Sequence, residues 1–265
     1  MTEPKPFIKW VGGKRKLVPE IVARMPKSFG AYHEPFMGGA ALFWYLRPTI
    51  AHLSDANERL VRTYRGVRDS VGSVIDLLGG YPNTPEFFYA HRVIDVDALS
   101  DVGAAAWFIY LNKTCFNGLY RVNKRGGFNS PFGSYANPTI CDSENLAACS
   151  AALKGVEIHH GSYLDVEGRA KEGDFVYFDP PYVPVSDSAN FTSYTADGFT
   201  HADQVALSQL ARRLRARDVR VILSNSDVPI VRNLYADFKI DTIMAARAIN
   251  SDGAKRGKVA EVLIY

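Results

Sequence analysis

The sequence of 265 residues contains little cysteine and no long hydrophobic run. Its three cysteines form no C-x-x-C pair, and its six histidines show no H-x₃₋₅-H spacing, so we expect neither a disulfide framework nor a metal site. No apolar stretch approaches the roughly 18 residues that span a bilayer. The polar start MTEPKPFIKW lacks the apolar core of a signal peptide. These absences favour a cytoplasmic protein without a membrane partner, and 47% hydrophobic residues predict a folded core.

The formal charge of +3 is small, but the charges are unevenly placed. Residues 1–33 carry seven basic residues against two acidic ones, and no acidic residue lies between Asp101 and Asp142. This acid-free interval interleaves cations such as Lys113 and Arg121 with aromatic residues. Such a mixture suits contact with phosphates and stacked bases, so it indicates a nucleic-acid partner. A chance gap in a buried segment is the alternative.

Both ends of the chain predict a Rossmann-like α/β sheet. Residues 29–36 read as a strand that leads into a glycine turn, a helix over 40–46, and a second strand over 49–54. Residues 174–178 form an apolar run typical of a buried parallel strand. Further along, Thr200 and Asp203 predict a helix start, and strands are expected over 219–224 and 259–265 with a loop over 247–258 between them.

The middle of the chain departs from this alternation. Stretches over 60–78 and 87–112 predict helices, and residues 119–124 and 128–135 flank a Gly126-Gly127 turn, as in a β-hairpin. We therefore expect one α/β domain built from residues 1–56 and 144–265, with a helical insert over 57–143 that carries the hairpin.

The strongest chemical signal is Asp179-Pro180-Pro181-Tyr182, directly after the apolar strand at 174–178. Ligands bind at the carboxyl edge of such sheets. Consecutive prolines stiffen the backbone and remove two N–H donors. The Asp179 carboxylate and the Pro180 carbonyl would thus accept from an exocyclic amino group while Tyr182 stacks on its ring. An ordinary D-P-P turn is the alternative.

A second signal is Glu34-Pro35-Phe36-Met37-Gly38-Gly39, where small residues after a strand allow a cofactor to approach the backbone. Neither a P-loop lysine nor a G-x-G-x-x-G motif is present, which disfavours nucleotide triphosphates and dinucleotides. Asp55 follows the next strand and could accept from ribose hydroxyls, or it could cap the helix that begins near Ala56. An adenosine cofactor without phosphates fits, and S-adenosylmethionine is the obvious one.

A third signal lies at the start of the chain, in Lys9-Trp10-Val11-Gly12-Gly13-Lys14. A tryptophan beside two glycines and flanked by lysines suggests a ring placed over a ligand. Anchoring of a terminal segment to the core is the commoner use of tryptophan.

In order along the chain, these motifs resemble the Dam-type N6-adenine DNA methyltransferases (D12 class, alpha group), over essentially the whole length. The resemblance extends to residues 110–133, which are similar to the family's DNA-reading hairpin, and to Asn190-Phe191-Thr192, which follow D-P-P-Y. Ala40 stands where the family often has glycine, and Ser134 where a basic residue is common.

The resemblance implies a role for each matching residue. The catalytic residues would be Asp179, Pro180 and Tyr182, and the S-adenosylmethionine site would comprise Trp10, Lys14, Glu34, Phe36, Gly38, Asp55 and Asp179. The residues that contact DNA would be Lys9, Phe116, Asn117, Leu119, Arg121, Asn123, Asn129 and Pro131. Phe116 would wedge into the base stack, and Arg121 would read a guanine edge.

The implied activity is methyl transfer from S-adenosylmethionine to adenine N6 in double-stranded DNA, with GATC as the expected target. S-adenosylhomocysteine would be the product, and no metal would take part. The target base would flip out of the duplex, and the enzyme would act as a monomer in the cytoplasm of a bacterial or phage-infected cell. An RNA base methyltransferase and a non-catalytic DNA-binding regulator are the alternatives. The hairpin disfavours the first, because the major groove of A-form RNA is too narrow to read; the intact Asp179-Pro180-Pro181-Tyr182 motif disfavours the second.

Overall fold

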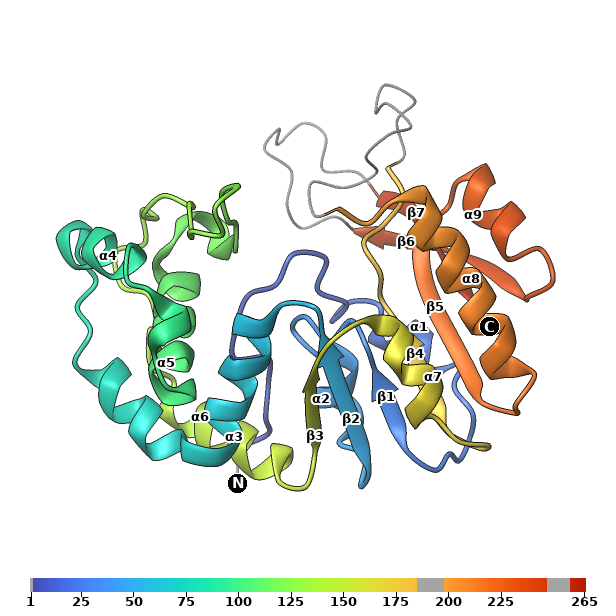
Figure 1. Cartoon of the computed structure of the whole chain (residues 1–265), viewed down its shortest axis with the longest axis horizontal. Helices are drawn as coiled ribbons and strands as arrows, with labels where there is room; N and C mark the ends of the chain where they lie inside the picture. The colour runs from blue at the N-terminus through green and yellow to red at the C-terminus, as the bar shows by residue number, and fades with distance from the viewer. Residues whose placement is uncertain (1, 185–197, 247–257) are drawn as a thin grey trace. The chain divides into compact units, whose positions relative to one another are not determined.

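The computed structural model describes residues 2–184, 198–246 and 258–265 (Figure 1). They divide into two compact units. Unit 1 comprises Met1–Lys14, Met37–Arg47 and Ser54–Gly161, and unit 2 comprises Arg15–Phe36, Pro48–Leu53 and Ser162–Tyr265. These units have other boundaries than the domains expected from the sequence, residues 1–56 with 144–265 and residues 57–143. The expected domains stay a prediction.

A seven-stranded sheet has the order β3-β2-β1-β4-β5-β7-β6. The strands are β1 (Tyr32–Glu34), β2 (Ala51–Asp55), β3 (Glu157–His160), β4 (Phe175–Phe178), β5 (Arg220–Ser226), β6 (Ile240–Ala246) and β7 (Lys258–Ile264). Strands β2, β1, β4 and β5 are parallel, whereas β7 runs antiparallel between β5 and β6. The expected Rossmann-like α/β class is therefore confirmed.

The strands predicted from the sequence are present, with shifted ends. The expected strand over 29–36 shortens to β1, and those over 49–54, 174–178, 219–224 and 259–265 become β2, β4, β5 and β7. Strands β3 and β6 were not predicted. Residues 190–192 lie outside the described residues, as does the loop expected over 247–258 except for Lys258, which begins β7.

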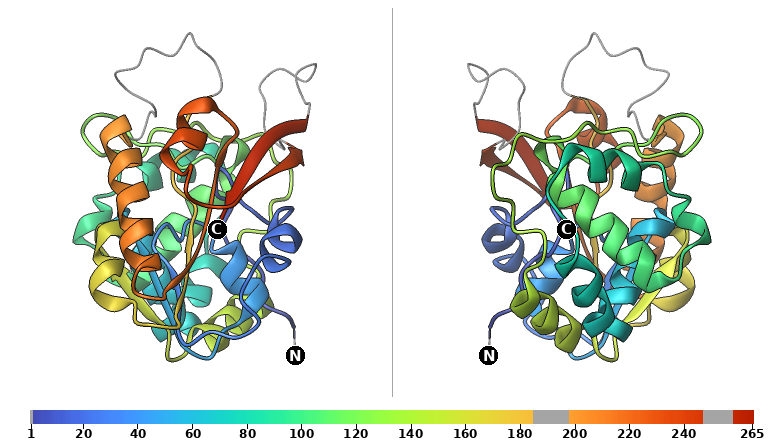
Figure 2. Two further views of the ribbon diagram at one scale, coloured as in Figure 1. Left: turned by 90° about the vertical axis from the view of Figure 1, so that its right-hand side faces the viewer. Right: turned by 90° about the vertical axis from the view of Figure 1, so that its left-hand side faces the viewer.

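In unit 2, helices α7 (Val166–Arg169), α8 (His201–Arg215) and α9 (Pro229–Leu234) pack against β4, β5 and β7. Their shared core includes Phe178, Leu210 and Leu223, all at most 1% exposed. Figure 2 shows α7 and α8, in yellow and orange, on one side of the sheet and α1 (Val18–Val22), in dark blue, on the other. The 3₁₀ turn η3 (Tyr163–Asp165) precedes α7.

The predicted start of α8 is confirmed as a capping box. The Thr200 side chain accepts from the backbone N–H of Asp203, and the Asp203 carboxylate accepts from the backbone N–H of Thr200. Two of the unpaired donors at a helix start are thereby satisfied. This cap fixes the residue at which α8 begins.

Unit 1 is built on helices. They are α2 (Ala41–Leu46), α3 (Glu58–Gly79), α4 (Pro85–Arg92), α5 (Asp101–Thr114) and α6 (Ser143–Leu153), with 3₁₀ turns η1 (Val96–Ala98) and η2 (Phe116–Gly118). Helix α3 packs closely on α5 at Gly66, where a Cβ would lie only 2.5 Å from the Asp101 carbonyl oxygen. Glycine at this position therefore permits the close approach. Ten of the fourteen residues of α5 are buried, so α5 forms the core of unit 1.

Two expectations for the middle of the chain are wrong in detail. The helical stretch expected over 87–112 is interrupted, since α4 ends at Arg92 and α5 begins at Asp101 behind the N-cap Ser100. The expected hairpin is not a continuous ladder: among the described residues, it has the isolated antiparallel bridges Cys115↔Phe132 and Val122↔Phe128. The Ser100 side chain accepts a hydrogen bond from the backbone N–H of Gly103 and so starts a separate helix. The apolar pattern alone does not predict this cap.

No helix in the described ranges is long and apolar enough to cross a membrane.

The start of β4 is tied to β1 by Asp174. Its Oδ1 accepts from the backbone N–H of Ala31 at 2.8 Å, and its Oδ2 accepts from the backbone N–H of Lys171 at 2.9 Å. The His33 ring lies 3.0 Å from Oδ2. Burial opposes the charged form, but the two backbone donors and His33 outweigh it and hold the pKa of Asp174 below its usual value.

We therefore expect Asp174→Asn to lower the free energy of unfolding by roughly 2–3 kcal/mol at pH 7, because buried N–H donors lose a charged acceptor. Urea denaturation measures this difference. It should shrink as the pH falls through the lowered native-state pKa, where the wild-type carboxylate itself becomes protonated. The exposed Asp76→Asn in α3 is the control and should stay within about 0.5 kcal/mol of wild type. Equal stability of Asp174→Asn and wild type at pH 7 would contradict the assignment.

Candidate active site

The Asp179-Pro180-Pro181-Tyr182 segment follows β4 without a gap and is fixed by neighbouring side chains of unit 2. Asp179 Oδ1 accepts from Ser224 Oγ at 3.0 Å, and the Tyr182 hydroxyl donates to Glu261 Oε2 at 3.0 Å. The Pro181 carbonyl accepts from Gln204 Nε2 at 3.0 Å. The segment thus has a single backbone course, set by β5, β7 and α8.

Carboxylates and tyrosine hydroxyls gather around this segment. Tyr32 OH donates to Glu34 Oε2 at 2.8 Å, and both residues are buried. Burial raises the pKa of Tyr32 well above its usual value, and the charges of Glu34 and Asp179 add to the shift. Burial and then the Asp179 charge likewise raise the pKa values of Tyr177 and Tyr182. These phenols therefore stay protonated as donors, and the carboxylates suit a ligand that carries positive charge.

Phe36 is placed by aromatic packing. Its ring stacks on Tyr163 with centroids 5.1 Å apart and meets Phe178 and Phe199 edge to face. Unit 2 thus contains five of the predicted site residues, namely Glu34, Phe36, Asp179, Pro180 and Tyr182.

Unit 1 contains the predicted site residues Trp10, Lys14, Gly38 and Asp55. Both the N–H and the carbonyl group of Gly38 are hydrogen-bonded to side chains. The Gly38 N–H donates to Asp55 Oδ2 at 3.1 Å, and the Gly38 carbonyl accepts from Tyr64 OH at 3.1 Å. Gly38 has φ +45°, and a Cβ there would lie 2.5 Å from Trp10 Cδ1. Only glycine fits this approach of the turn to the tryptophan ring.

Asp55 lies at the end of β2 and does not cap the following helix. Its Oδ1 accepts from the Asn57 N–H at 2.9 Å, while the N-cap of α3 is Asn57 itself. Burial raises the pKa of Asp55, against the opposing effect of the Asn57 and Gly38 donors. Each carboxylate oxygen has a second lone pair, so Asp55 keeps acceptor capacity for a ligand hydroxyl.

Ala40 also has a left-handed backbone, with φ +49°. A non-glycine residue pays roughly 1–2 kcal/mol in this region. Glycine would adopt this conformation without that cost.

Trp10 is half-buried, and its contacts agree with the anchoring interpretation, while its placement over a ligand stays a prediction. Its ring lies 6.3 Å from the Phe108 ring and 6.0 Å from the Tyr120 ring, so it is anchored to unit 1. It also packs against the Gly38 turn. Lys14 is buried, and its Nζ donates to the Gly12 carbonyl at 2.6 Å.

The segment over 115–135 presents several of the predicted DNA-contacting residues to solvent. Phe116 is 50% exposed, Asn117 has φ +54° and is exposed, and Arg121, Asn129 and Pro131 are exposed as well. Leu119 is half-buried.

Asn123 shapes the turn of this segment. Its Oδ1 accepts from the backbone N–H groups of Arg125 and Gly127 at 2.9 and 3.0 Å. The predicted DNA contact therefore has a structural use as well, since asparagine stabilises such turns.

Lys9 is joined to the same segment. Its Nζ lies 3.1 Å from the Tyr135 hydroxyl and 4.2 Å from the centre of that ring. The Lys9 backbone exchanges hydrogen bonds with the buried Asn112 side chain. Lys9 is thus joined to the acid-free interval, and we call Lys9 together with the exposed Phe116, Arg121 and Arg125 the basic, aromatic surface of unit 1.

Sequence reasoning missed Tyr177, Ser224, Glu261 and Asn112. A polar Ser-Asn-Ser run at the carboxyl end of the apolar strand over 219–224 was the available signal for Ser224. Glu261 had no such signal, because its contact with Tyr182 depends on the antiparallel placement of β7.

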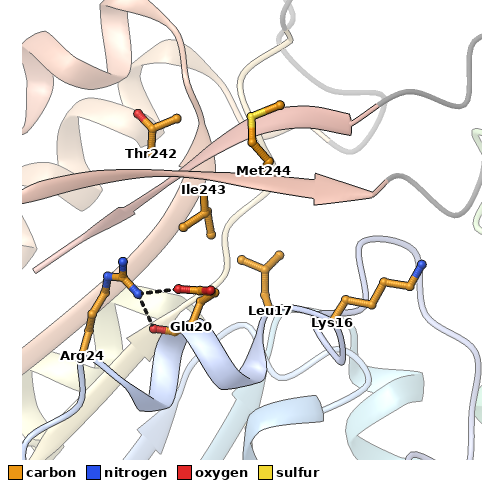
Figure 3. Close-up of a pocket in the computed structure, with 7 residues that line it drawn as sticks. All are labelled: Lys16, Leu17, Glu20, Arg24, Thr242, Ile243 and Met244. Atoms are coloured by element: carbon orange, nitrogen blue, oxygen red, sulfur yellow. Dashed lines mark hydrogen bonds and ion pairs between the residues drawn. The ribbon is translucent and has the colours of Figure 1, made fainter.

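A separate hollow of about 470 Å³ lies between α1 and β6 (Figure 3). It is lined by Lys16, Leu17, Glu20, Arg24, Thr242, Ile243 and Met244. On the α1 side of the hollow, Arg24 forms an ion pair with Glu20, 2.8 Å long. None of these seven is a predicted site residue, so the hollow is distinct from the residues described above.

Comparisons with known proteins identify relatives of this chain. The sequence model of the D12 class N6 adenine-specific DNA methyltransferases matches residues 10–249. The chain is 41% identical to the Type II methyltransferase M1.LlaDCHI of Lactococcus lactis subsp. cremoris, over 98% of this chain and 94% of that protein. It is 39% identical to the Type II methyltransferase M.MjaIII of Methanocaldococcus jannaschii, over 96% of each. It is 34% identical to the DNA adenine methylase of Escherichia coli K12, over 99% and 95%.

The chain therefore belongs to the D12 class of N6 adenine-specific DNA methyltransferases. It is an adenine-specific DNA methyltransferase.

Gly38→Ala should displace Trp10 and lower the free energy of unfolding by about 1–3 kcal/mol, because the Cβ clashes with the ring and φ is positive. Thermal unfolding followed by tryptophan fluorescence measures both effects. The matched control is Gly72→Ala in α3, where a Cβ meets nothing within 4 Å. That variant should be as stable as wild type or up to about 1 kcal/mol more stable. A Gly38→Ala protein as stable as wild type, with an unchanged spectrum, would refute the close packing.

Proposed function

We propose that the protein transfers a methyl group from S-adenosylmethionine to adenine N6 in double-stranded DNA, within GATC, after the base has flipped out of the duplex. The observation that supports this most directly is the fixed Asp179 carboxylate at the carboxyl end of β4, beside the prolines and Tyr182. Open α/β sheets bind their ligands at this edge, where the strand order reverses between β1 and β4.

The chemistry requires an activated amine. The N6 lone pair of adenine is delocalised into the ring, which makes it a poor nucleophile. Hydrogen bonds from its two N–H groups to Asp179 and to the Pro180 carbonyl would hold the nitrogen nearer to tetrahedral geometry. Because positive charge grows on N6 as it attacks, these acceptors stabilise the transition state more than the ground state.

When bound, S-adenosylmethionine supplies an electrophilic methyl group on a sulfonium. The N6–CH₃ bond forms as the S–CH₃ bond breaks, the bonding electron pair goes to sulfur, and S-adenosylhomocysteine results. The extra N6 proton becomes acidic only after this step, so Asp179 can be a weak base and still receive it.

The donor set fits such a cofactor in both units. Asp55, at the carboxyl end of β2, would accept from the ribose hydroxyls, and Trp10, Lys14 and the Gly38 turn would bound the site. In unit 2, the proposed cofactor residues are Glu34, Phe36 and Asp179, whose carboxylates suit a cationic group.

Duplex DNA would be bound by the basic, aromatic surface of unit 1. Exposed Phe116 would wedge into the base stack, and Asn117 would border the space left by the extruded base. Lys9, Asn123 and Asn129 would contact the backbone or the bases. Leu119 and Pro131 would touch a thymine methyl, and Arg121 would read guanine O6 and N7. The protein would act as a monomer.

Asp179→Ala should lower the single-turnover methylation rate at least about 1000-fold, because a preorganised acceptor is lost. Circular dichroism and thermal unfolding should show a folded protein. Asp179→Asn keeps an acceptor oxygen and should lose less. Wild-type turnover in Asp179→Ala would overturn the proposed role.

Arg121→Ala should relax base preference at one target position, with a loss of roughly 1–3 kcal/mol in discrimination there. Single-base sequencing of N6-methyladenine in DNA from expressing cells measures the profile. The neighbouring exposed Arg125→Ala is the control: its loss weakens binding evenly and leaves the profile unchanged. A profile unchanged in Arg121→Ala would remove Arg121 from the base-reading residues.

A further inference from the structure

A chain of buried hydroxyls lies behind Asp179. Ser224 Oγ donates to Asp179 Oδ1 at 3.0 Å, and the Tyr177 hydroxyl lies 3.0 Å from Ser224 Oγ. Ser224 is 0% exposed and Tyr177 is 1% exposed. Solvent therefore does not compete for these hydrogen bonds, and they are stronger than equivalent bonds on a surface.

The direction of the chain follows from its last member. An ionised carboxylate only accepts hydrogen bonds, so the Ser224 proton points to Asp179. The Ser224 oxygen is then left to accept from Tyr177, which donates its phenolic proton. Burial and the Asp179 charge raise the pKa of Tyr177, which keeps this donor protonated. Both dipoles thus point toward the Asp179 carboxylate.

The sheet register explains why these residues meet. Tyr177 of β4 is opposite Ile222 of β5 in a parallel pair. The pairing ends at Phe178 and Leu223, and its continuation by one residue brings Asp179, directly after β4, opposite Ser224 and on the same face of the sheet as Tyr177. Strand pairing therefore fixes the Ser224 hydroxyl beside the carboxylate independently of the irregular chain that follows Asp179.

We propose that Ser224, supported by Tyr177, is a positioning residue that sets the plane of the Asp179 carboxylate; this rests on the role of Asp179 proposed above. Without the Ser224 hydrogen bond, the Asp179 carboxylate can rotate about its side-chain torsions. Its oxygens are then no longer aligned with the N–H group of the adenine amine. The rate of methyl transfer depends on that alignment. DNA binding depends on residues of unit 1, and cofactor binding is shared between Asp179 and the six other proposed cofactor residues, so both change less than the rate.

The test compares single-turnover methylation with binding. Ser224→Ala should lower the rate constant roughly 10- to 100-fold on a duplex that the wild-type protein methylates. The Kd values for S-adenosylmethionine and for DNA should stay within about twofold, since the altered group acts on orientation. Ser224→Thr restores a hydroxyl and should recover most of the rate, which a purely structural role does not predict.

Tyr177→Phe extends the test to the second hydroxyl. It should slow methylation less than Ser224→Ala, because the bond to Asp179 remains. The double variant should be no slower than Ser224→Ala, since the tyrosine acts only through the serine. Additive losses in the double variant would overturn the chain.

Ser208→Ala is the matched control. Ser208 of α8 is also buried in unit 2, at 1% exposed, and its hydroxyl donates to the Val205 carbonyl at 2.8 Å. The variant loses the same group at the same burial and should keep the wild-type rate.

The outcomes separate the two proposals. Wild-type turnover in Ser224→Ala, with Asp179→Ala inactive, overturns the positioning role and leaves the function in place. Wild-type turnover in Asp179→Ala overturns the proposed role of Asp179 itself. If Ser224→Ala does not fold, Ser224→Cys keeps the volume with a weaker donor. An intermediate rate in Ser224→Cys supports the proposal, and a wild-type rate overturns it.

Discussion

Parallel pairing of β4 with its neighbours is the constraint on which the site depends. Because β4 lies between β1 and β5 and runs parallel to both, the carboxyl ends of all three strands lie at the same edge of the sheet. Glu34, Asp179 and Ser224 are carried to this edge by three separate parts of the chain. Strand β4 is buried along its whole length, and its Tyr177 hydroxyl bonds to Ser224, so the residues that can meet a ligand begin directly after the strand, at Asp179.

The electrostatics of unit 2 follow from that convergence. Carboxylates at one edge would repel one another, but each has a hydroxyl that donates to it: Tyr32 to Glu34, Ser224 to Asp179, and Tyr182 to Glu261. These bonds spread the negative charge without cancelling it. The result is a preorganised environment that favours a cation, which is the charge that a sulfonium brings and that a methylated amine develops.

Sequence patterns predicted the parts of the molecule that local chemistry determines. The apolar β4, the Asp179-Pro180-Pro181-Tyr182 segment after it and the Thr200 cap could all be read from adjacent residues. Strand β6, the Glu261 contact and the reduction of the hairpin to two bridges depend on pairings distant in the chain. Ser100 is the instructive exception, because a local cap interrupted a helix that the apolar pattern extended.

Strand β7 adds a consequence for the order of events during synthesis. Tyr182 and its acceptor Glu261 are 79 positions apart, and β7 is inserted between two strands that precede it in the chain. At about 5–20 residues per second on the ribosome, the tyrosine waits several seconds for its partner. Until β7 has been made, β5 and β6 have no strand to join them. A nascent chain can therefore complete the segments of unit 1, which end at Gly161, well before it can hold Tyr182 in place.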